Sequence, residues 1–300
     1  MVLVSENFTQ LVDFDPVLTE IFYQHYNQIA PKRASIFGMR TSNKAKETDL
    51  RIGSFGDPTE FNGKVEYETP KADYEIEYDF PEFAKGFMIT RKMLDDKQYD
   101  SVFSSAADMG TAFGRKMEKD AASVFNNAFQ TTAPYLGYDS KGLCASDHPR
   151  SQSDSTAVDN SLALALNAAN LETAIITHQA LADDKGEEIS IMPDTLIVPR
   201  ALAKTGRELV GSPLTPESAN NAINVHSGMN LIVWEFLTDS NAWFIIDSTM
   251  AKRYLKWYDR VPVEFAATDD FDTLIRKYRG YGRWGYGWSD FRFIMGSNPS

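Results

Sequence analysis

The feature that most constrains this chain is a long amphipathic segment between residues 100 and 130. That segment carries one apolar stripe with steps of three or four residues, formed by Val102, Ala106, Met109, Phe113, Met117, Ala121, Val124, Phe125 and Ala128. The spacing predicts an α-helix, with Asp100 or Ser101 as its N-cap. A helix of about 30 residues is roughly 45 Å long, which exceeds the usual helix of a compact domain. We therefore expect a spine on which other elements pack.

A second constraint is an acidic segment, residues 49–91, in which apolar and acidic side chains alternate. The alternation runs through Val65, Glu66, Tyr67, Glu68 and Thr69, and again through Tyr74, Glu75, Ile76, Glu77, Tyr78, Asp79 and Phe80. It predicts a two-stranded hairpin with its turn at residues 70–73, or at Asn62-Gly63 as the alternative. Two strands alone are only marginally stable in water. The hairpin therefore packs either on its own domain or on a neighbouring subunit.

The rest of the chain divides into three further regions. Residues 1–48 are typical of an arm with one short helix, at about 16–29, that ends before Pro31. A loop-rich stretch at 131–160 marks a domain boundary. Residues 161–254 have the pattern of an α/β unit, in which we expect helices at 162–181 and 201–210 and strands at 194–199, 230–236 and 242–247, the last two joined by a turn at 238–241.

The C-terminal region, residues 255–300, is rich in aromatic side chains interleaved with glycines 280, 282, 285 and 287. We predict one long strand over 283–295, with close backbone approaches at the glycines. These glycines do not open a helix, so they do not form a phosphate-binding loop.

Charge and cysteine content restrict the partners and the compartment. The formal net charge is −12, and no run of Lys or Arg exceeds two residues, so a dedicated nucleic-acid binder is disfavoured. Cys144 is the only cysteine, which excludes an intrachain disulfide and fits a reducing cytosol. The N-terminus lacks the pattern of a signal peptide, and no window is apolar enough for a membrane span.

Residue patterns for catalysis and metal binding are weak. The sequence has neither a P-loop nor a nucleophile elbow, and its four histidines lack zinc spacing. Asp147-His148 is an acid–base pair without a nucleophile, and Asp147 is better explained by backbone hydrogen bonds in a turn. The acidic group Asp269, Asp270 and Asp272 is better explained as a turn or helix cap than as a cation site. We expect no enzyme activity, no metal and no cofactor.

The order of these parts, together with several local segments, resembles a known family. The segments are Lys85–Asp96 (KGFMITRKMLDD), Leu143–Pro149 (LCASDHP), Asp194–Leu202 (DTLIVPRAL), Trp243–Asp247 (WFIID), Arg260–Asp270 (RVPVEFAATDD) and Lys277–Gly287 (KYRGYGRWGYG). They resemble the Mu-like phage major head subunit family, whose members have the Hong Kong 97-type capsid fold. The likeness covers most of the chain from about residue 60 onward.

The resemblance implies an α+β fold with five parts. They are an N-terminal arm (1–48), an extended β-hairpin or E-loop (49–91), a peripheral domain with the spine helix (92–160), an axial α/β domain (161–254) and C-terminal strands that return to the peripheral domain (255–300). It also implies a major capsid protein that forms hexamers and pentamers of an icosahedral phage head around double-stranded DNA. The shell would be a virion component assembled in the host cytoplasm. Expected partners are further copies of the chain, a separate scaffolding protein, a portal and a decoration protein.

Contacts between subunits would join the acidic hairpin of one copy to basic side chains of another. The acidic candidates are Glu66, Glu68, Glu75, Glu77 and Asp79, and the basic candidates are Lys32, Arg33, Arg91, Lys92, Arg115 and Lys116. Two other structural functions compete with this interpretation. One is an encapsulin-type compartment that holds protein cargo, and the other is a phage tail protein.

Overall fold

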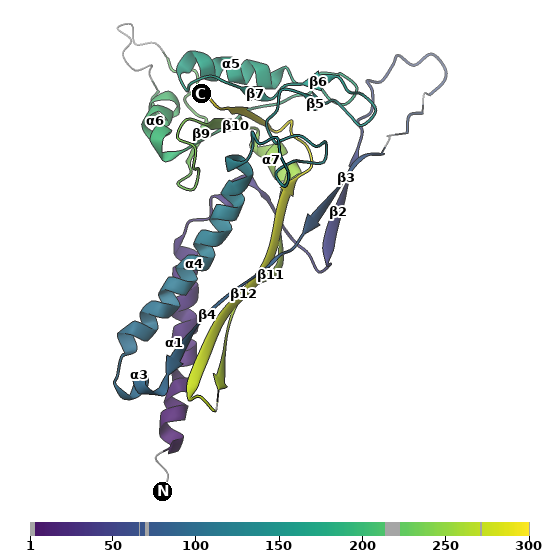
Figure 1. The fold of residues 1–300 in the computed structure, drawn as a ribbon. Helices are drawn as coiled ribbons and strands as arrows, with labels where there is room; N and C mark the ends of the chain where they lie inside the picture. The colour runs from purple at the N-terminus through teal and green to yellow at the C-terminus, as the bar shows by residue number, and fades with distance from the viewer. Residues whose placement is uncertain (1–3, 66, 70–71, 214–222, 271, 300) are drawn as a thin grey trace.

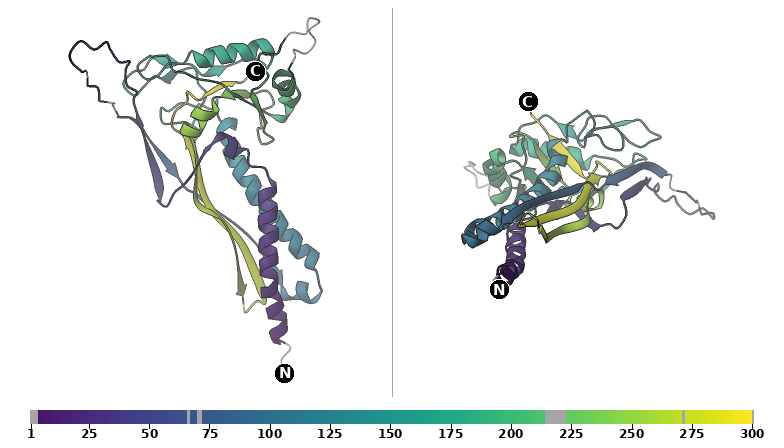
Figure 2. Two further views of the ribbon diagram at one scale, coloured as in Figure 1. Left: turned by 180° about the vertical axis from the view of Figure 1, so that it is seen from behind. Right: turned by 60° about the horizontal axis from the view of Figure 1, so that its bottom comes forward.

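The structure is a computed structural model that describes residues 4–65, 67–69, 72–213, 223–270 and 272–299. Figure 1 shows an elongated part, built from two long helices and a long sheet, below a more compact part that carries the C-terminus. We call these the peripheral part and the axial part. A narrow β-ribbon leaves the junction and runs up beside the axial part (Figures 1 and 2).

Two long helices form one side of the peripheral part. α4 spans Tyr99–Asn126, and α1 spans Val4–Gln28 and lies beside it in both ribbon views (Figures 1 and 2). Most of the predicted apolar stripe is buried on α4, which confirms the spine helix, although it ends at Asn126. The predicted cap is wrong, because the N-cap position is Gln98 and its side chain makes no capping bond.

The helix of the arm packs on the spine of its own subunit. α1 begins before the predicted start, and Pro16 lies within it. Leu18 and Phe22 are fully buried, and the Phe22 ring lies 6.1 Å from Phe113 of α4 and 4.8 Å from Phe265 of the sheet. The apolar spacing of the arm is thus explained by contacts inside one chain.

Gly110 allows the backbones of α1 and α4 to approach closely. A Cβ atom at this position would lie 2.3 Å from the carbonyl oxygen of Phe22, and that backbone atom can move only if α1 shifts. We expect Gly110→Ala to lower the free energy of unfolding by about 1–3 kcal/mol, even though alanine favours helix. Urea unfolding of the subunit measures this. The control is Gly211→Ala on another helix, where nothing lies within 4 Å of the added methyl; a gain in stability at both sites would contradict the close approach.

A four-stranded sheet forms the other side of the peripheral part, in the order β1-β11-β12-β4. β11 and β12 form a long antiparallel hairpin, β4 pairs antiparallel with β12, and β1 pairs parallel with β11. β4 is therefore an edge strand of this sheet. The bounds are β1 Gly38–Thr41, β4 Glu82–Thr90, β11 Leu255–Asp270 and β12 Ile275–Trp288.

The predicted C-terminal strand over 283–295 is wrong in its bounds. β12 ends at Trp288, and the chain turns and enters the axial sheet as β13, Ile294–Ser297. All four residues of β13 are buried, which suits a strand paired on both edges, by β10 and β7. The expected close approach at the glycines does occur, since a Cβ at Gly285 would lie 2.3 Å from the carbonyl oxygen of Asp79. The C-terminal region thus serves both parts and does not simply return to the peripheral one.

The axial part is a five-stranded sheet in the order β7-β13-β10-β8-β9. The predicted strands at 194–199, 230–236 and 242–247 are present, but β9 and β10 are not neighbours, because β8 lies between them. The helix expected at 162–181 begins only at Ala168, where the side chain of Asn167 accepts a hydrogen bond from the Asn170 N–H. The bounds are β7 Ser161–Leu162, β8 Thr195–Val198, β9 Asn230–Val233, β10 Trp243–Ile246, α5 Ala168–Gln179, η1 Arg200–Leu202, α6 Ala203–Gly211 and α7 Ser248–Tyr254.

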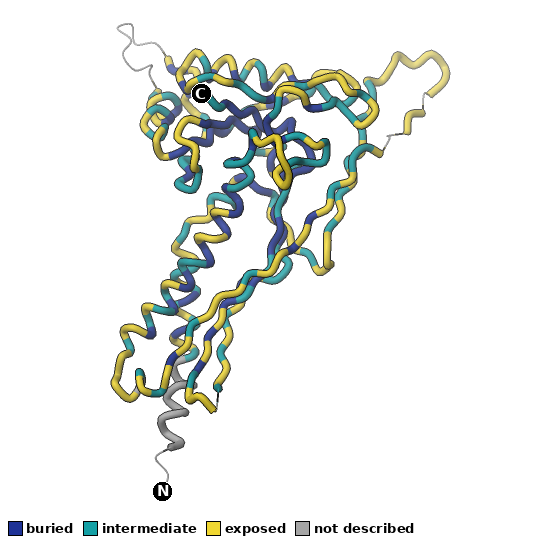
Figure 3. The backbone as a smooth tube through the Cα atoms, in the orientation of Figure 1, coloured by how far each residue is buried: buried dark blue, intermediate teal, exposed yellow. Residues whose placement is uncertain are grey.

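The C-terminal end of the spine joins the two parts. The ring of Phe125 on α4 lies 5.5 Å from Trp234 and 5.4 Å from Phe244 of the axial part, and buried residues are concentrated around this junction in Figure 3. Residues 131–160, the expected boundary, also reach it, because Leu143 and Cys144 belong to the same buried cluster as Phe125 and Phe244. Short elements around this core are α2 Arg33–Ile36, α3 Arg91–Asp95, β5 His148–Pro149 and β6 Ala157–Val158.

The extended ribbon consists of β2 (Lys46–Ile52), β3 (Ala72–Asp79) and the connecting loop 53–71, of which residues 66, 70 and 71 lie outside the described residues. β3 agrees with the predicted second strand. The first strand is wrong: β3 pairs with β2, and the described residues of 65–69 belong to the loop. The predicted turn at 70–73 is only half described, and Ala72 and Asp73 already belong to β3.

The charged inward face of β2 explains why it was missed. Asp49 and Arg51 point towards the body of the subunit and are partly buried, whereas Leu50 and Ile52 are 49% and 62% exposed. Asp49 pairs with the buried Lys256 of β11. Alternation of apolar residues predicts strands whose inner face is apolar, and β2 has the reverse arrangement.

Candidate inter-subunit surfaces

The acidic row lies on the outer face of β3. Glu75, Glu77 and Asp79 are exposed, while Tyr78 and Phe80 are buried, with exposed fractions of 2% and 4%. The predicted period-2 separation of carboxylates from aromatic rings therefore holds on this strand. Glu66 lies outside the described residues.

Some of these acids already have partners within the subunit. Lys46 of β2 lies 3.2 Å from Glu77 and 3.1 Å from Asp79, and hydrogen bonds to Asp79 and then Glu77 raise the pKa of Lys46. Glu68 pairs with Lys185 of the axial part and accepts a 2.9 Å hydrogen bond from the Gly56 N–H. Lys185 and then Gly56 lower the pKa of Glu68. Glu75 makes no ion pair within the described part of the chain.

Two of the basic candidates bind inside their own subunit. Lys32 pairs with Glu235 and donates to the Val233 carbonyl at 2.5 Å. Arg33 pairs at 2.8 Å with Glu118, whose side chain is 1% exposed, and its guanidinium lies 5.4 Å from the Trp257 ring centroid. Burial raises the pKa of Glu118, and Arg33 opposes that shift. Both cations thus hold α2 to the body, so we exclude them from the contact surface proposed below.

Arg91 and Lys92 lie on α3, at the far end of the spine from the axial part (Figure 1). Arg91 has a 3.7 Å contact with Asp95, a residue one turn away. Lys92 is exposed. The structure does not bring these two side chains close to the other basic candidates.

Arg115 and Lys116 line a groove of about 450 Å³ between the edge strand β4 and α4. Lys85 of β4 and Lys119 of α4 complete a basic rim, and the groove also contains Phe83 and Phe113. Lys116 lies 4.7 Å from the Phe83 ring centroid and 2.5 Å from Asp120. We call this feature the basic groove, and its one lining acid is Glu82.

Sequence reasoning missed Lys85 and Lys119 as members of this groove. The i, i+4 spacing of Arg115 and Lys119 could have revealed that both lie on one helix face. The contribution of β4 could not be deduced in the same way, because it depends on how the sheet packs against the helix.

The loop of the ribbon exposes large apolar side chains. Those exposed by more than half are Phe55 at 64%, Phe61 at 71%, Val65 at 54% and Tyr67 at 93%. Together with Leu50 and Ile52 of β2 they form what we call the apolar tip. Asp57 and Glu60 lie among them in the sequence. Several exposed large apolar side chains within one segment mark a candidate protein-binding site.

The titratable groups considered for chemistry have structural partners. His148 is paired at 2.6 Å with Asp139, and both side chains are fully buried, whereas Asp147 pairs with Lys141. The predicted role of Asp147 in capping a turn is replaced by this ion pair. Asp269 and Asp270 pair with Arg276 and Lys277 across the β11–β12 hairpin. Within the described residues no cluster of three or more potential metal ligands occurs, and no helix there is long and apolar enough to cross a membrane.

Comparison with known proteins gives one family match and many fold matches. A family model described as "Phage capsid protein" matches residues 73–295, well over half of the chain. No curated protein matches the sequence. The structure is similar to the capsid of the cyanophage P-SCSP1u (TM-score 0.60, 10% identity, 90% of this chain and 88% of that one). It is also similar to the procapsid of bacteriophage JBD30, with a TM-score of 0.54 and 13% identity over 97% of this chain and 76% of that one. A virus-like particle from Pyrococcus furiosus matches with a TM-score of 0.56 and 13% identity over 94% of this chain and 98% of that one.

These fold matches confirm the predicted Hong Kong 97-type architecture. At such low identities they show the fold alone, which phage shells and other particles share. The family match separates the alternatives, because it is to phage capsid proteins. The narrower Mu-like assignment stays a prediction.

Proposed function

The chain belongs to the phage capsid protein family and is a major capsid protein of a phage head, and from this premise we propose how its copies contact one another. In the proposal, the apolar tip and the acidic row of one subunit dock on the basic groove of the next subunit around a hexamer or pentamer. The observation that carries it is the outer face of the ribbon, where β2 exposes apolar side chains and β3 presents the acidic row.

The apolar contribution comes from the tip. Six large side chains that are half exposed or nearly so are costly to leave in water, at about 25 cal/mol for each Å² of apolar surface. The basic groove offers the half-buried Phe83 between its cations, above the buried Phe113. In the proposed contact, an aromatic side chain such as Phe61 meets Phe83 while Glu60 meets the rim.

The electrostatic contribution comes from opposite charge on the two surfaces. The chain carries a net charge of −12, yet the groove is lined by Lys85, Arg115, Lys116 and Lys119 and by one acid, Glu82. Lys116 is already paired with Asp120. Complementary charge selects orientation and speeds encounter more than it adds affinity. Repeated in every capsomer, it supports one geometry of contact.

Charge reversal in the groove tests this contact. We expect Arg115→Glu with Lys119→Glu to reduce closed shells by more than about tenfold, because like charges facing each other at an interface cost several kilocalories per mole. Negative-stain electron microscopy and sedimentation measure shells, and circular dichroism checks that the subunit is folded. Arg115→Lys with Lys119→Arg is the matched control and should assemble normally.

Complementary reversal makes the test specific for the acidic row. By itself, the variant Glu75→Lys with Glu77→Lys should impair assembly. When it is combined with the reversed groove, which is the variant Arg115→Glu with Lys119→Glu, part of the assembly should return. Normal shells from the reversed groove, or from Glu75→Lys with Glu77→Lys alone, would contradict the proposed contact.

The remaining parts of the proposal follow from the family. The shell encloses double-stranded DNA without specific binding, assembles in the host cytoplasm with a scaffolding protein and a portal, and can carry a decoration protein. The chain acts without catalysis, which is supported by the structural partners found for His148, Asp147 and the acids of the β11–β12 hairpin. Particles purified from infected cells would test the contents, since protein cargo in place of DNA would favour a compartment.

A further inference from the structure

The extended ribbon is attached to its own subunit at three levels that differ in chemistry. At its root the attachment is mostly apolar: Tyr78 and Phe80 pack on Tyr258, with ring centroids 5.2 Å and 5.9 Å apart, beside the ion pair of Asp49 with the buried Lys256. The Tyr78 ring also lies against the backbone of β12, where a Cβ at Gly287 would be 2.8 Å from it. This root is buried and continuous with the peripheral sheet.

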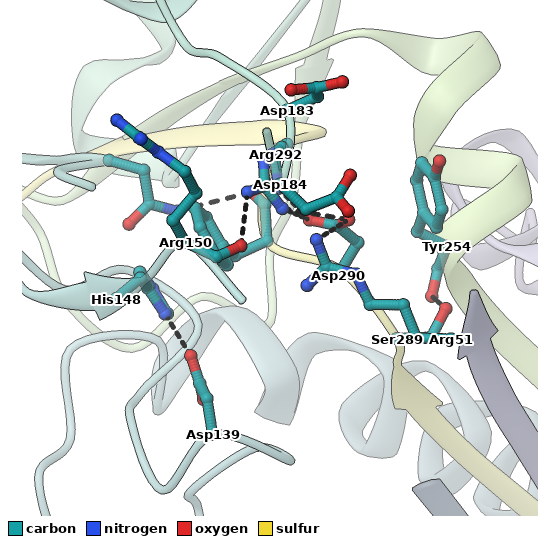
Figure 4. A network of polar contacts seen from close by, with 12 residues as sticks. Arg51, Asp139, His148, Arg150, Asp183, Asp184, Tyr254, Ser289, Asp290 and Arg292 are labelled. Atoms are coloured by element: carbon teal, nitrogen blue, oxygen red, sulfur yellow. Dashed lines mark hydrogen bonds and ion pairs between the residues drawn. The ribbon is translucent and has the colours of Figure 1, made fainter. Parts of the chain in front are cut away.

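The middle attachment is a buried ionic cluster. Arg51 of β2 lies 3.4 Å from Asp73 of β3 and 3.2 Å from Asp290, and it donates to the Tyr138 hydroxyl at 2.9 Å. Asp290 also binds Arg292, so the cluster pairs two cations with two carboxylates. Figure 4 shows Arg51 and Arg292 converging on Asp290.

The distal attachment is polar and partly exposed. The Ser54 N–H donates to Asp184 at 2.9 Å, and the Ser54 hydroxyl contacts both Asp183 and Asp184. Lys185 pairs with Glu68, and the two side chains are 29% and 47% exposed. Every one of these contacts joins the loop of the ribbon to the turn that contains residues 183–185 of the axial part.

That turn is itself well ordered by local hydrogen bonds. The Asp183 carboxylate accepts from the backbone N–H of Lys185 at 2.8 Å and of Glu187 at 2.9 Å, and the Asp183 N–H donates to the Glu187 carbonyl at 2.9 Å. Gly186 has φ +91°, a conformation that glycine adopts at little cost. The turn therefore presents Asp184 and Lys185 in a defined position.

We propose that the turn at residues 183–185 is a latch that holds the extended ribbon of the free subunit against its own axial part, and that it opens when the ribbon docks on a neighbour. The exposed pairs of the latch are weak and readily exchanged, whereas the apolar root is not. Once the latch is released, the ribbon can swing about its root. This movement requires that the buried ionic cluster around Arg51 either breaks its contacts to Asp290 or moves together with the ribbon.

The latch competes with assembly for the loop of the ribbon. Glu68, one of the acidic candidates for contact with a neighbouring subunit, lies in the loop that the proposed function docks on the neighbouring groove, and in the free subunit it already pairs with Lys185. This second element of the inference rests on the proposed function. The latch itself does not, since all its contacts lie within one chain.

A distance measurement in the unassembled full-length chain tests the latch. Spin labels at Asn62→Cys in the ribbon loop and Gln179→Cys at the end of α5 would report their separation by pulsed electron resonance. Both sites are exposed, whereas Cys144 is buried and burial raises its pKa, so it stays unlabelled. We expect one narrow distribution, which Lys185→Glu broadens and which Glu68→Lys added to Lys185→Glu narrows again.

Any of three results would overturn the latch. They are a broad distance distribution in the original chain, no effect of Lys185→Glu on that distribution, and no narrowing when Glu68→Lys is added to Lys185→Glu.

A separate assay addresses the competition between the latch and shell assembly. Lys185→Ala should shorten the lag of shell formation about threefold, a factor typical of one exposed ion pair. An unchanged or longer lag with a broadened distribution would reject the competition while keeping the latch. If the variant Arg115→Glu with Lys119→Glu forms normal shells, the proposed docking on the groove is rejected. The distance measurements would still test the latch, because they use the unassembled chain.

Discussion

Arg292→Met is expected to lower the free energy of unfolding by about 3–5 kcal/mol, the usual cost of removing one partner from a buried ion pair. The Arg292 side chain is only 3% exposed. It donates from Nε to the Ala182 carbonyl at 2.7 Å and from Nη2 to the Arg150 carbonyl at 2.9 Å. From Nη1 it contacts both carboxylate oxygens of Asp290 at 3.3 Å.

Methionine fills a similar volume but satisfies none of these acceptors. Two buried carbonyls would lose their donor, and Asp290 would keep only Arg51 as a cationic partner. Because these acceptors lie in three separate segments, around residues 150, 182 and 290, their loss loosens the seam between the axial part and the ribbon (Figure 4).

Urea unfolding of the unassembled subunit at neutral pH measures the effect. Arg200→Met is the matched control, because Arg200 is exposed on η1 and surface substitutions usually change stability by less than about 0.5 kcal/mol. If Arg292→Met and Arg200→Met lower the free energy of unfolding by the same small amount, the buried ionic cluster around Asp290 adds little to the stability of the fold.

Lowering the pH from 7.5 to 5 is expected to reduce stability by about 2 kcal/mol through His178 alone. Burial lowers the pKa of His178 to about 4, and the hydrogen bond to the Arg292 carbonyl only partly opposes this. The ring is fully buried on α5, and its Nε2–H donates to that carbonyl at 3.0 Å. The imidazole is therefore held neutral in the folded state.

The sign follows from which state binds more protons. Between the unfolded pKa of about 6.5 and the folded pKa of about 4, the unfolded chain is protonated at this site and the folded chain is not. The contribution is therefore complete above pH 6.5 and is lost as the pH falls towards 4. Glu118, whose pKa is raised by burial, acts in the opposite direction, so comparison with a variant is needed to isolate His178.

His178→Gln should remove this slope, although it also lowers stability at pH 7.5 by altering a buried contact. Unfolding free energies at several pH values between 7.5 and 5 give the slope for each protein. His25→Gln on α1 is the matched control and should keep the original slope. If the original chain and His178→Gln lose stability in parallel, the buried neutral histidine is not the cause.

Elements with a strictly local signal were predictable from the sequence. The spine helix, β3, β8 and α6 all have apolar residues at the spacing of their secondary structure, so the pattern alone predicts them. The capsid-type fold was likewise predicted, from the order of the parts and from the resemblance of several segments. It is supported by the family match over residues 73–295.

The errors arose where the partner of a residue lies far away in the sequence. β2 was missed because its inward side chains are charged, and those charges are neutralised by Lys256 and Asp290 from the C-terminal region. For Lys32 and Arg33, which were candidates for contact with a neighbouring subunit, the fold places Glu235 and Glu118 of the same chain beside them. A formal charge on a sequence does not reveal whether a partner lies in the same chain.

Local periodicity and composition therefore determined the helices, most of the axial strands and the acidic outer face of the ribbon, because each depends on residues two to four positions apart. The tertiary structure decided which strands pair, which charges remain free and which side chains meet in the basic groove and the latch. The basic groove and the latch join residues 30 or more positions apart, such as Lys85 with Arg115 and Glu68 with Lys185. Only the packing of the whole chain brings such residues together.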